Sequence, residues 1–396
     1  MDNTPPESPE PRRSRARERQ ERRKQRQQAP APAPSRSHRQ IAPAGGFKMP
    51  EIHLPTDRRI LYGIGGLLVI LVVILALGRF KNDDSPLPPN ALWLGTEWTY
   101  EEPDEAGVQA LAARLRENQI GTVYAWVSWL KDDETWAGRR DLTNNFSEVE
   151  TQVKTFVQQF KAAYPEAQLF GWLGVASNKS DGTERLSEST VQQAVSDMSQ
   201  RVIDEFGFDG VFLNVEPVWN GDEGFLDVLR KARADLGDAA LIAVAVPPDW
   251  SPLGVDIPVP PLIVPGTVWD EEYKQRVALL TDQMAVMAYN SGLTSTASFT
   301  AADYELWMAY QVKTFAEAVN LLDTGTTIFI GIPTYPAELP GHDPVVENIG
   351  SAIRGIRTGL QEAGDAAAAV RGVAIYADWT TDDTEWAQFK TLWVTP

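Results

Sequence analysis

The sequence predicts an α/β fold, a (β/α)8 TIM barrel, over residues 91–396. Two observations predict it. Short apolar strand-like segments alternate with amphipathic helical segments along this part of the chain, and eight such strands fit within roughly 300 residues. Strands that are each followed by a helix imply a parallel sheet with right-handed crossovers. An open doubly wound sheet is the alternative, but no glycine-rich phosphate loop follows the first strand.

The predicted elements alternate regularly along the chain. The strands are expected at 92–98, 122–129, 168–175, 210–216, 241–246, 283–289, 327–332 and 372–379. Between them, apolar residues at helical spacing predict helices at 105–118, 148–163, 189–206, 223–236, 303–322 and 349–363, with a shorter helix at 270–280.

Residues 1–59 predict a disordered basic arm. They contain 14 Lys and Arg against 7 Asp and Glu, whereas the rest of the chain contains 22 against 47. Residues 1–50 nearly lack large apolar side chains, so they cannot bury enough surface to fold. The arginines between Arg12 and Arg26 could contact nucleic acid or anionic lipid, but we favour a solvated tail and expect no nucleic-acid partner.

Residues 60–78 form an uncharged apolar run about as long as a bilayer core requires. Because this run follows a long arm, we expect a retained single transmembrane helix rather than a cleaved signal peptide or a buried core helix. The basic N-terminal flank places the arm in the cytoplasm and the barrel on the other side of the cell membrane. The proline-rich residues 79–90 predict a short stiff linker.

The composition excludes several kinds of site. There is no cysteine, so neither a disulfide framework nor a thiol nucleophile exists. Of the three histidines, His38 and His53 lie in the arm, which leaves only His342 in the barrel. A multi-histidine metal site is therefore excluded, and we expect no metal and no organic cofactor. A Ser-His-Asp triad would need His342, whose surroundings in the sequence (Gly-His-Asp-Pro) favour a turn.

The segment that ends at Glu216 is the most informative stretch of the chain. Side chains alternate across a strand, so Phe208, Gly210, Phe212, Asn214 and Glu216 share one face. The apolar residues come first on that face and the two polar ones come last. A packed core does not hold a glutamate unless something pairs with it or uses it. Since active sites of parallel barrels lie at the C-terminal strand ends, Glu216 is the leading functional candidate.

This segment resembles the fourth-strand motif of glycoside hydrolase family 18, the chitinases and their relatives. The family pattern is Asp-Gly-x-Asp-x-Asp-x-Glu, and Asp209, Gly210 and Glu216 match it. The two middle aspartates of the pattern fall on Phe212 and Asn214, so the chain departs from the family at both.

Two further segments carry the resemblance. Met287-Ala-Tyr289-Asn290 is similar to the sixth-strand Met-x-Tyr-Asp pattern, with Asn290 where the family has Asp. The segment 372–379 resembles the eighth strand, near whose end the family has a tryptophan that floors the sugar subsite. Tyr376 or Trp379 could take that place, and the spacing favours Tyr376.

The resemblance implies substrate-assisted hydrolysis of a β-linked N-acetylhexosamine. Glu216 would protonate the glycosidic oxygen, and the acetamido group of the sugar would attack its own anomeric carbon. Asn214 and Tyr289 would contact that acetamido group. Asn214 can accept a hydrogen bond but brings no charge to stabilise the cationic intermediate, so we expect slower chemistry, a different substrate or no hydrolysis. The remaining residues expected to contact substrate are Asp209, Met287, Asn290, Trp98, Tyr376 and Trp379.

Other residues near the predicted strand ends could complete a site. Glu97, Asp249 and Asp378 are carboxylates that could form a pair with Glu216, although caps or turns explain each of them more simply. Flat aromatic rings stack on sugar faces, and tryptophans cluster at these ends or plug them: Trp98, Trp129, Trp172, Trp219, Trp250 and Trp379.

The sequence as a whole predicts a membrane-anchored, extracytoplasmic glycoside hydrolase-like barrel that acts on a polysaccharide or amino-sugar glycan of the cell envelope. The alternative is a non-catalytic, lectin-like glycan-binding module that kept the cleft and lost the aspartate. A third possibility is an envelope scaffold in which the basic arm does the work and the barrel is passive.

Overall fold

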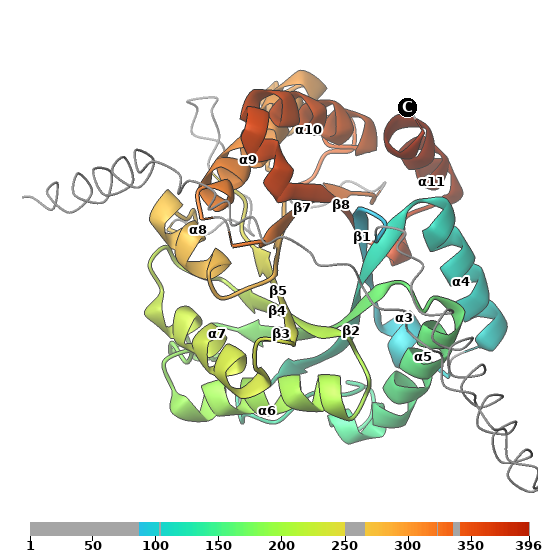
Figure 1. Cartoon of the computed structure of the whole chain (residues 1–396), viewed down its shortest axis with the longest axis vertical. Coiled ribbons are helices and arrows are strands. Elements are labelled where there is room, and N and C mark those ends of the chain that lie inside the picture. Colours follow the sequence, from blue (N-terminus) through green and yellow to red (C-terminus); the bar gives the residue numbers. More distant parts are fainter. Residues whose placement is uncertain (1–86, 103, 250–265, 323, 336–340, 396) are drawn as a thin grey trace, which may run out of the picture. The chain divides into compact units, whose positions relative to one another are not determined.

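The computed structural model describes residues 87–396 apart from 103, 250–265, 323, 336–340 and 396. Within these residues, eight parallel strands form a closed barrel in the order β1 to β8, which confirms the predicted (β/α)8 fold. Figure 1 looks along the barrel and shows the strands as a central ring with the helices outside it. The expected arm (1–59), the expected membrane helix (60–78) and most of the expected linker (79–90) lie outside the described residues. In the part of the chain that is described, no helix is long and apolar enough to cross a membrane.

The strands and helices alternate as expected. The strands are β1 (Asn90–Leu94), β2 (Ile120–Leu130), β3 (Gln168–Ala176), β4 (Gly210–Glu216), β5 (Leu241–Val246), β6 (Gln283–Val286), β7 (Thr327–Pro333) and β8 (Val370–Tyr376). The helices are α3 (Thr96–Thr99), α4 (Glu105–Glu117), α5 (Glu150–Ala163), α6 (Ser189–Asp204), α7 (Glu223–Leu236), α8 (Glu271–Ala278), α9 (Ala301–Asn320), α10 (Ile349–Ala363) and α11 (Asp383–Phe389). Short 3-10 turns occupy Phe146–Glu148, Ser295–Ala297, Gly364–Ala369 and Asp378–Thr380, and a π turn occupies Lys390–Val394.

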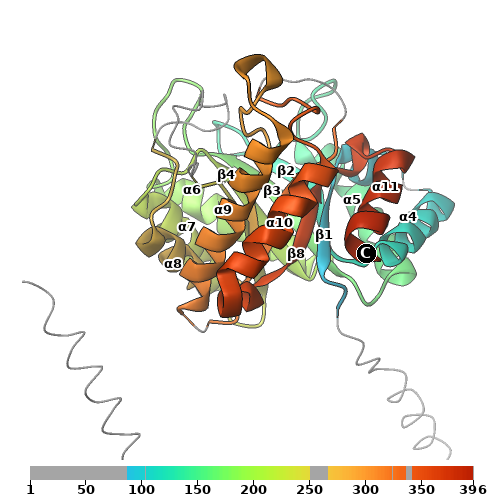
Figure 2. The same cartoon turned by 90° about the horizontal axis from the view of Figure 1, so that it is seen from above.

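Three strands end earlier than the sequence pattern predicted. β1 stops at Leu94 rather than at 98, because the chain turns at Gly95 into the short helix α3, where the Trp98 amide donates to the Gly95 carbonyl at 3.3 Å. β6 stops at Val286 rather than at 289, and β8 stops at Tyr376 rather than at 379. Aromatic residues that looked like strand residues therefore belong to the connections at the C-terminal end of the barrel, which Figure 2 shows gathered on one side.

Short aspartate caps start several of the outer helices. Asp222 accepts from the Phe225 amide at 3.0 Å at the start of α7, and Asp270 accepts from the Tyr273 amide at 2.8 Å at the start of α8. Each cap satisfies an amide that has no partner inside its helix. The caps fix where the chain leaves the C-terminal strand ends, and so they help to shape the rim of the barrel.

An aromatic layer fills the inside of the barrel beneath its C-terminal end. The rings of Tyr124 and Phe212 stack with centroids 4.1 Å apart, and Trp93 contacts both of them at 5.4 and 6.0 Å. Phe212 is fully buried. The position where the family pattern has a middle aspartate is thus part of the apolar core, where an unpaired carboxylate would be costly.

This packing predicts how the barrel responds to change at residue 212. Phe212→Asp should lower the free energy of unfolding by roughly 4 kcal/mol or more, because it leaves a cavity and buries an unpaired carboxylate. Phe212→Leu, which keeps the site apolar, should cost only about half as much. Urea unfolding of the two variants beside the wild type measures both values. Equal losses in the two variants would mean that the site tolerates charge and that this view of the layer is wrong.

Candidate functional site

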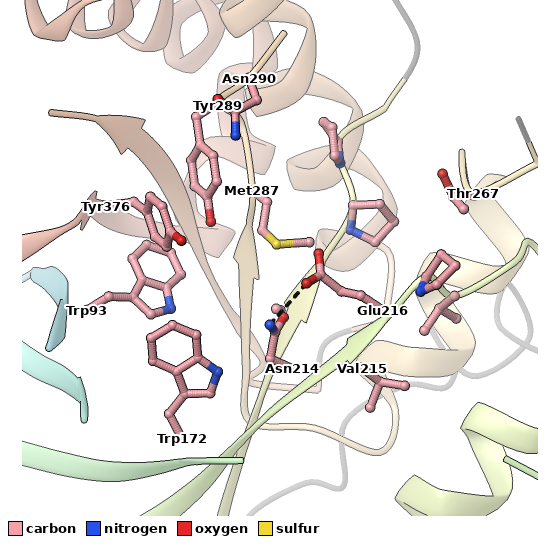
Figure 3. A pocket seen from close by; sticks show the side chains of 15 residues that line it. Trp93, Trp172, Asn214, Val215, Glu216, Thr267, Met287, Tyr289, Asn290 and Tyr376 are labelled. Carbon is pink, nitrogen blue, oxygen red and sulfur yellow. Dashed lines mark hydrogen bonds between the residues drawn. The ribbon is translucent and has the colours of Figure 1, made fainter. Parts of the chain in front are cut away.

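Strand β4 delivers two polar side chains to a cavity at the C-terminal end of the barrel. Asn214 and Glu216 follow the buried Phe212 on the same strand face, as the alternation predicted. Parallel pairing with β3 aligns Asn214 with Gly174 and Glu216 with Ala176. The cavity has a volume of about 270 Å³, which is close to the lower end for small-molecule sites. Figure 3 shows both side chains at its centre.

Aromatic rings form one wall of this cavity. Tyr289 and Tyr376 stack with ring centroids 4.4 Å apart and planes 14° apart, and Trp93 meets Tyr376 edge-on at 5.4 Å. The close approach of Tyr289 to β7 depends on Gly331, where an added Cβ would lie 2.9 Å from the tyrosine ring. Trp172 adds a further ring from β3 (Figure 3). The wall is aromatic and closely packed, and aromatic rings of this kind can stack on the faces of sugars.

The Glu216 carboxylate lies where protonation is favoured. The side chain is reached by solvent from the cavity, yet protein atoms surround its carboxylate, and this desolvation raises its pKa above the usual 4.5. A hydrogen bond from Asn214 Nδ2 to Glu216 Oε2, 3.1 Å long, opposes the shift by stabilising the charged form. Burial also raises the pKa of Tyr289, so that its hydroxyl stays protonated and can donate.

Two buried polar atoms on residues that line the cavity have no hydrogen-bond partner among the described residues. They are Asn214 Oδ1, an acceptor, and Trp172 Nε1, a donor. Since Asn214 uses its amide nitrogen on Glu216, its oxygen is left as the free acceptor. Both residues line the cavity, so an acceptor and a donor stand next to it without a partner among the described residues.

The sixth-strand residues of the family pattern also reach the cavity. Met287, Tyr289 and Asn290 all line it. Asn290 has a left-handed backbone conformation, with φ at 53°, which asparagine tolerates better than most residues. Its backbone N–H donates to a carboxylate oxygen of the fully buried Glu347 at 2.7 Å, and its side-chain oxygen accepts from the Tyr335 hydroxyl at 2.6 Å. Asn290 is therefore held at the edge of the cavity by two strong contacts.

The structure does not bring every expected contact residue to this cavity. Asp209 lies at the other end of β4, where it pairs with Lys161 Nζ at 2.5 Å and accepts from the Leu169 amide at 2.8 Å, so it stabilises the base of the barrel. Trp98 is in α3 and donates to Asp378 at 2.7 Å. Trp379 is 44% exposed at the rim, 5.6 Å from the Tyr376 ring, so Tyr376 and not Trp379 lines the cavity.

The other candidate carboxylates and the histidine have partners elsewhere. Glu97 accepts from the Gly95 amide at 3.1 Å, Asp249 forms a buried ion pair with Lys274, and Asp378 accepts from Trp98. None of the three lines the cavity. His342 is buried, with Nδ1 3.0 Å from Glu347 and Nε2 3.1 Å from the Tyr335 carbonyl, so the segment is more than a surface turn and provides no triad base.

Sequence reasoning missed several residues that line the cavity. Trp93 was assigned only to a strand and Trp172 only to a group of tryptophans, and Thr267 was not considered. The period-2 alternation of β1 could have identified Trp93, because Ala91 and Trp93 share the inward face. No signal in the sequence marks Thr267. Among the described residues, no cluster of three or more His, Asp or Glu side chains is arranged to hold a metal ion.

Comparison with known proteins finds structural likeness without sequence likeness. No family model and no curated protein sequence matches the chain. The C-terminal domain of a presumptive chitinase from Desulfitobacterium hafniense is similar, with a TM-score of 0.51 and 10% identity over 76% of this chain and 97% of that one. A family 18 chitinase mutant from Cycas revoluta bound to (GlcNAc)4 has a TM-score of 0.49 and 12% identity, over 77% and 99% of the two chains. The spore cortex-lytic enzyme SleL of Bacillus cereus has a TM-score of 0.48 and 11% identity, over 76% and 73%.

The likeness is one of fold. At 10% identity and a TM-score of 0.51, the Desulfitobacterium domain supports a barrel of the chitinase type for this chain.

The raised pKa of Glu216 predicts a pH-dependent effect on stability. The Glu216 carboxyl binds its proton more tightly in the folded state than in the unfolded state. The folded protein therefore becomes less stable as the pH rises above the pKa of this carboxyl in the unfolded chain, which is about 4.5. Glu216→Gln should therefore raise the melting temperature at pH 7 to 8, and this gain should vanish below pH 4. Glu362→Gln, an exposed change on α10, is the control for the loss of a carboxylate. Thermal unfolding at several pH values makes the comparison, and a pH-independent difference at Glu216 would contradict the assigned shift.

Proposed function

We propose that the barrel hydrolyses β-linked N-acetylhexosamine glycans, with Glu216 as the general acid. One observation carries the proposal: among the described residues, Glu216 is the only carboxylate that lines the cavity, and the groups around it suit an acetamido substituent. Among the residues described around the cavity, no second carboxylate is available as a protein nucleophile or a paired general base. A nucleophile supplied by the substrate fits this lining, in agreement with the resemblance to family 18.

The proposed reaction uses few protein groups. Glu216 gives its proton to the glycosidic oxygen as the bond between that oxygen and the anomeric carbon breaks. The carbonyl oxygen of the acetamido group forms a new bond to the same carbon and gives a cyclic oxazolinium ion. Water then opens the ring, and the Glu216 carboxylate accepts a proton from that water.

Asn214, Tyr289 and Trp172 would hold the acetamido group in place. The free Asn214 Oδ1 accepts the acetamido N–H, while the Tyr289 hydroxyl and Trp172 Nε1 are the available donors to its oxygen. Met287, Asn290 and Tyr376 shape the subsite around the sugar ring. No cofactor takes part in this scheme.

A glycan-binding protein without hydrolysis is the second candidate function. The observation that favours it is Asn214 itself, because a neutral amide does not stabilise a developing cation as a carboxylate does. Phe212, buried in the aromatic layer, offers no replacement charge. The retained Glu216 favours the enzyme, since a lectin has no need for a proton donor.

We also propose that the barrel acts outside the cytoplasm, tethered by the apolar residues 60–78. The support comes from the sequence: an uncharged run of bilayer length preceded by a basic flank. A cell-envelope glycan would then be within reach of the site.

The enzyme proposal predicts Glu216-dependent product release. The wild-type barrel should release shorter oligomers from N-acetylglucosamine oligomers, and Glu216→Gln should lower the rate by at least roughly a hundredfold, because general acid catalysis contributes about that much or more. Glu362→Gln is the matched control for loss of a carboxylate. Chromatographic product analysis and binding of the same oligomers should be measured together. Binding without turnover would select the glycan-binding alternative, and absence of both would overturn the amino-sugar assignment.

We expect a carboxylate at position 214 to increase the rate of hydrolysis. Asn214→Asp should raise the turnover number on the order of tenfold, since a charge-assisted contact to the acetamido N–H stabilises the oxazolinium ion better than a neutral one. The new charge should also raise the pKa of Glu216 and move the alkaline limb of the rate profile to higher pH. Asn214→Leu removes the acceptor and should abolish turnover. If Asn214→Asp changes neither the turnover number nor the alkaline limb of the pH–rate profile, Asn214 does not contact the reacting acetamido group.

A further inference from the structure

A second cavity lies beside the first at the same end of the barrel. It has a volume of about 510 Å³ and is bounded by the start of α3, the end of β2 and residues 138–141. The two cavities meet at a pair of rings, because Trp126 of the second packs edge-on against Trp172 of the first with centroids 4.8 Å apart. A chain-like ligand that occupies both cavities would pass over these two rings.

The walls of the second cavity are fixed tryptophans. Trp126 donates its ring nitrogen to the Tyr100 hydroxyl at 3.1 Å, and that hydroxyl donates to the Val127 carbonyl at 2.7 Å. The polar atom of Trp126 is thus satisfied by the protein, and the rest of the ring remains as an apolar surface. Trp129 is half-buried on the same strand and supports the ring wall further out.

The charged residues of the second cavity are not equivalent. Arg139 is neutralised by Glu101 at 3.2 Å and also donates to the Tyr100 carbonyl, so it is part of the framework. Arg140 is exposed, lies over the Trp129 ring at 5.3 Å, and forms no hydrogen bond or ion pair with any described residue. Asp141, the remaining charged residue on the lining, makes no ion pair with it either. The guanidinium is held by its stack while its hydrogen-bonding edge stays open.

An open arginine edge in this setting selects for a carboxylate. The chain beyond residue 59 has 47 acidic against 22 basic side chains, so its overall field repels anions, and an anionic group needs a local fixed cation to bind. A stacked guanidinium provides one, with a planar fork that matches a carboxylate. An uncharged sugar would leave that fork unused.

We propose that the second cavity binds a carboxylate carried by the glycan, with Arg140 as the residue that recognises it. This inference rests on the proposed function, and it names the substrate class as an acidic amino-sugar glycan. The carboxylate could belong to a sugar substituent or to a peptide attached to the glycan. Both sources present the same group to Arg140.

The test uses the full-length chain in detergent with Glu216→Gln, so that ligands are bound but not cleaved. Three probes of equal length are compared by calorimetry: an N-acetylglucosamine oligomer, an oligomer alternating N-acetylglucosamine with N-acetylmuramic acid, and the latter with its carboxylates converted to amides. The acid should bind about tenfold more tightly than its amide, which is the value of one charge-assisted contact. Adding Arg140→Gln should remove that preference, whereas Arg230→Gln, on the outer helix α7, should keep it.

The outcomes separate this inference from the proposed function. If the neutral oligomer binds but no acidic oligomer, with or without a peptide, binds more tightly than its amide, or if the preference survives Arg140→Gln, the inference is wrong and the proposed function stands. If no oligomer binds, the proposed function fails and takes the inference with it. A peptide-bearing oligomer tests the source: an Arg140-dependent preference seen only with it assigns the carboxylate to the peptide.

Discussion

Closure of the barrel is the constraint on which the site depends. The last strand pairs with the first, with Ala91 opposite Ala374 and Leu92 opposite Ile375, and this brings residues almost 300 positions apart to one rim. Trp93 and Tyr376 meet only because of this pairing. With all eight strands parallel, every C-terminal end faces the same way, and the side chains after them converge on one cavity. The aromatic layer below fills the barrel and gives that cavity a rigid floor.

Local patterns were enough to predict the fold and to place Asn214 and Glu216 together at the C-terminal end of the barrel. The sequence pattern predicted eight strands and seven intervening helices, so small errors in any one element did not change the architecture. The period-2 alternation on β4 placed Asn214 and Glu216 correctly, because the strand continues without interruption up to Glu216. Residues 287–290 also reach the cavity, although they follow the end of β6 rather than belong to it.

The other residues of the cavity depend on where the strands end and on which loops face each other. Local periodicity in the sequence predicts neither. Trp98 looked like the end of the first strand, but the turn at Gly95 places it in helix α3, and it does not line the cavity. Asp209 matches the family motif, yet it lies a whole strand length from Glu216 and pairs with Lys161. Trp172 and Thr267 line the cavity through contacts that only the closed barrel creates.

The two unpaired polar atoms on the lining of the cavity have a consequence for selectivity. Asn214 Oδ1 and Trp172 Nε1 are an acceptor and a donor that water reaches poorly, so whatever fills the cavity has to satisfy both. A hydroxyl in place of the N-acetyl group is shorter and would have to serve both atoms at once, whereas an acetamido group presents its N–H and its carbonyl oxygen at separate points. On the proposed function, an unsubstituted sugar that leaves one of the two atoms unpaired would bind on the order of tenfold more weakly, so that selectivity comes from rejection rather than attraction.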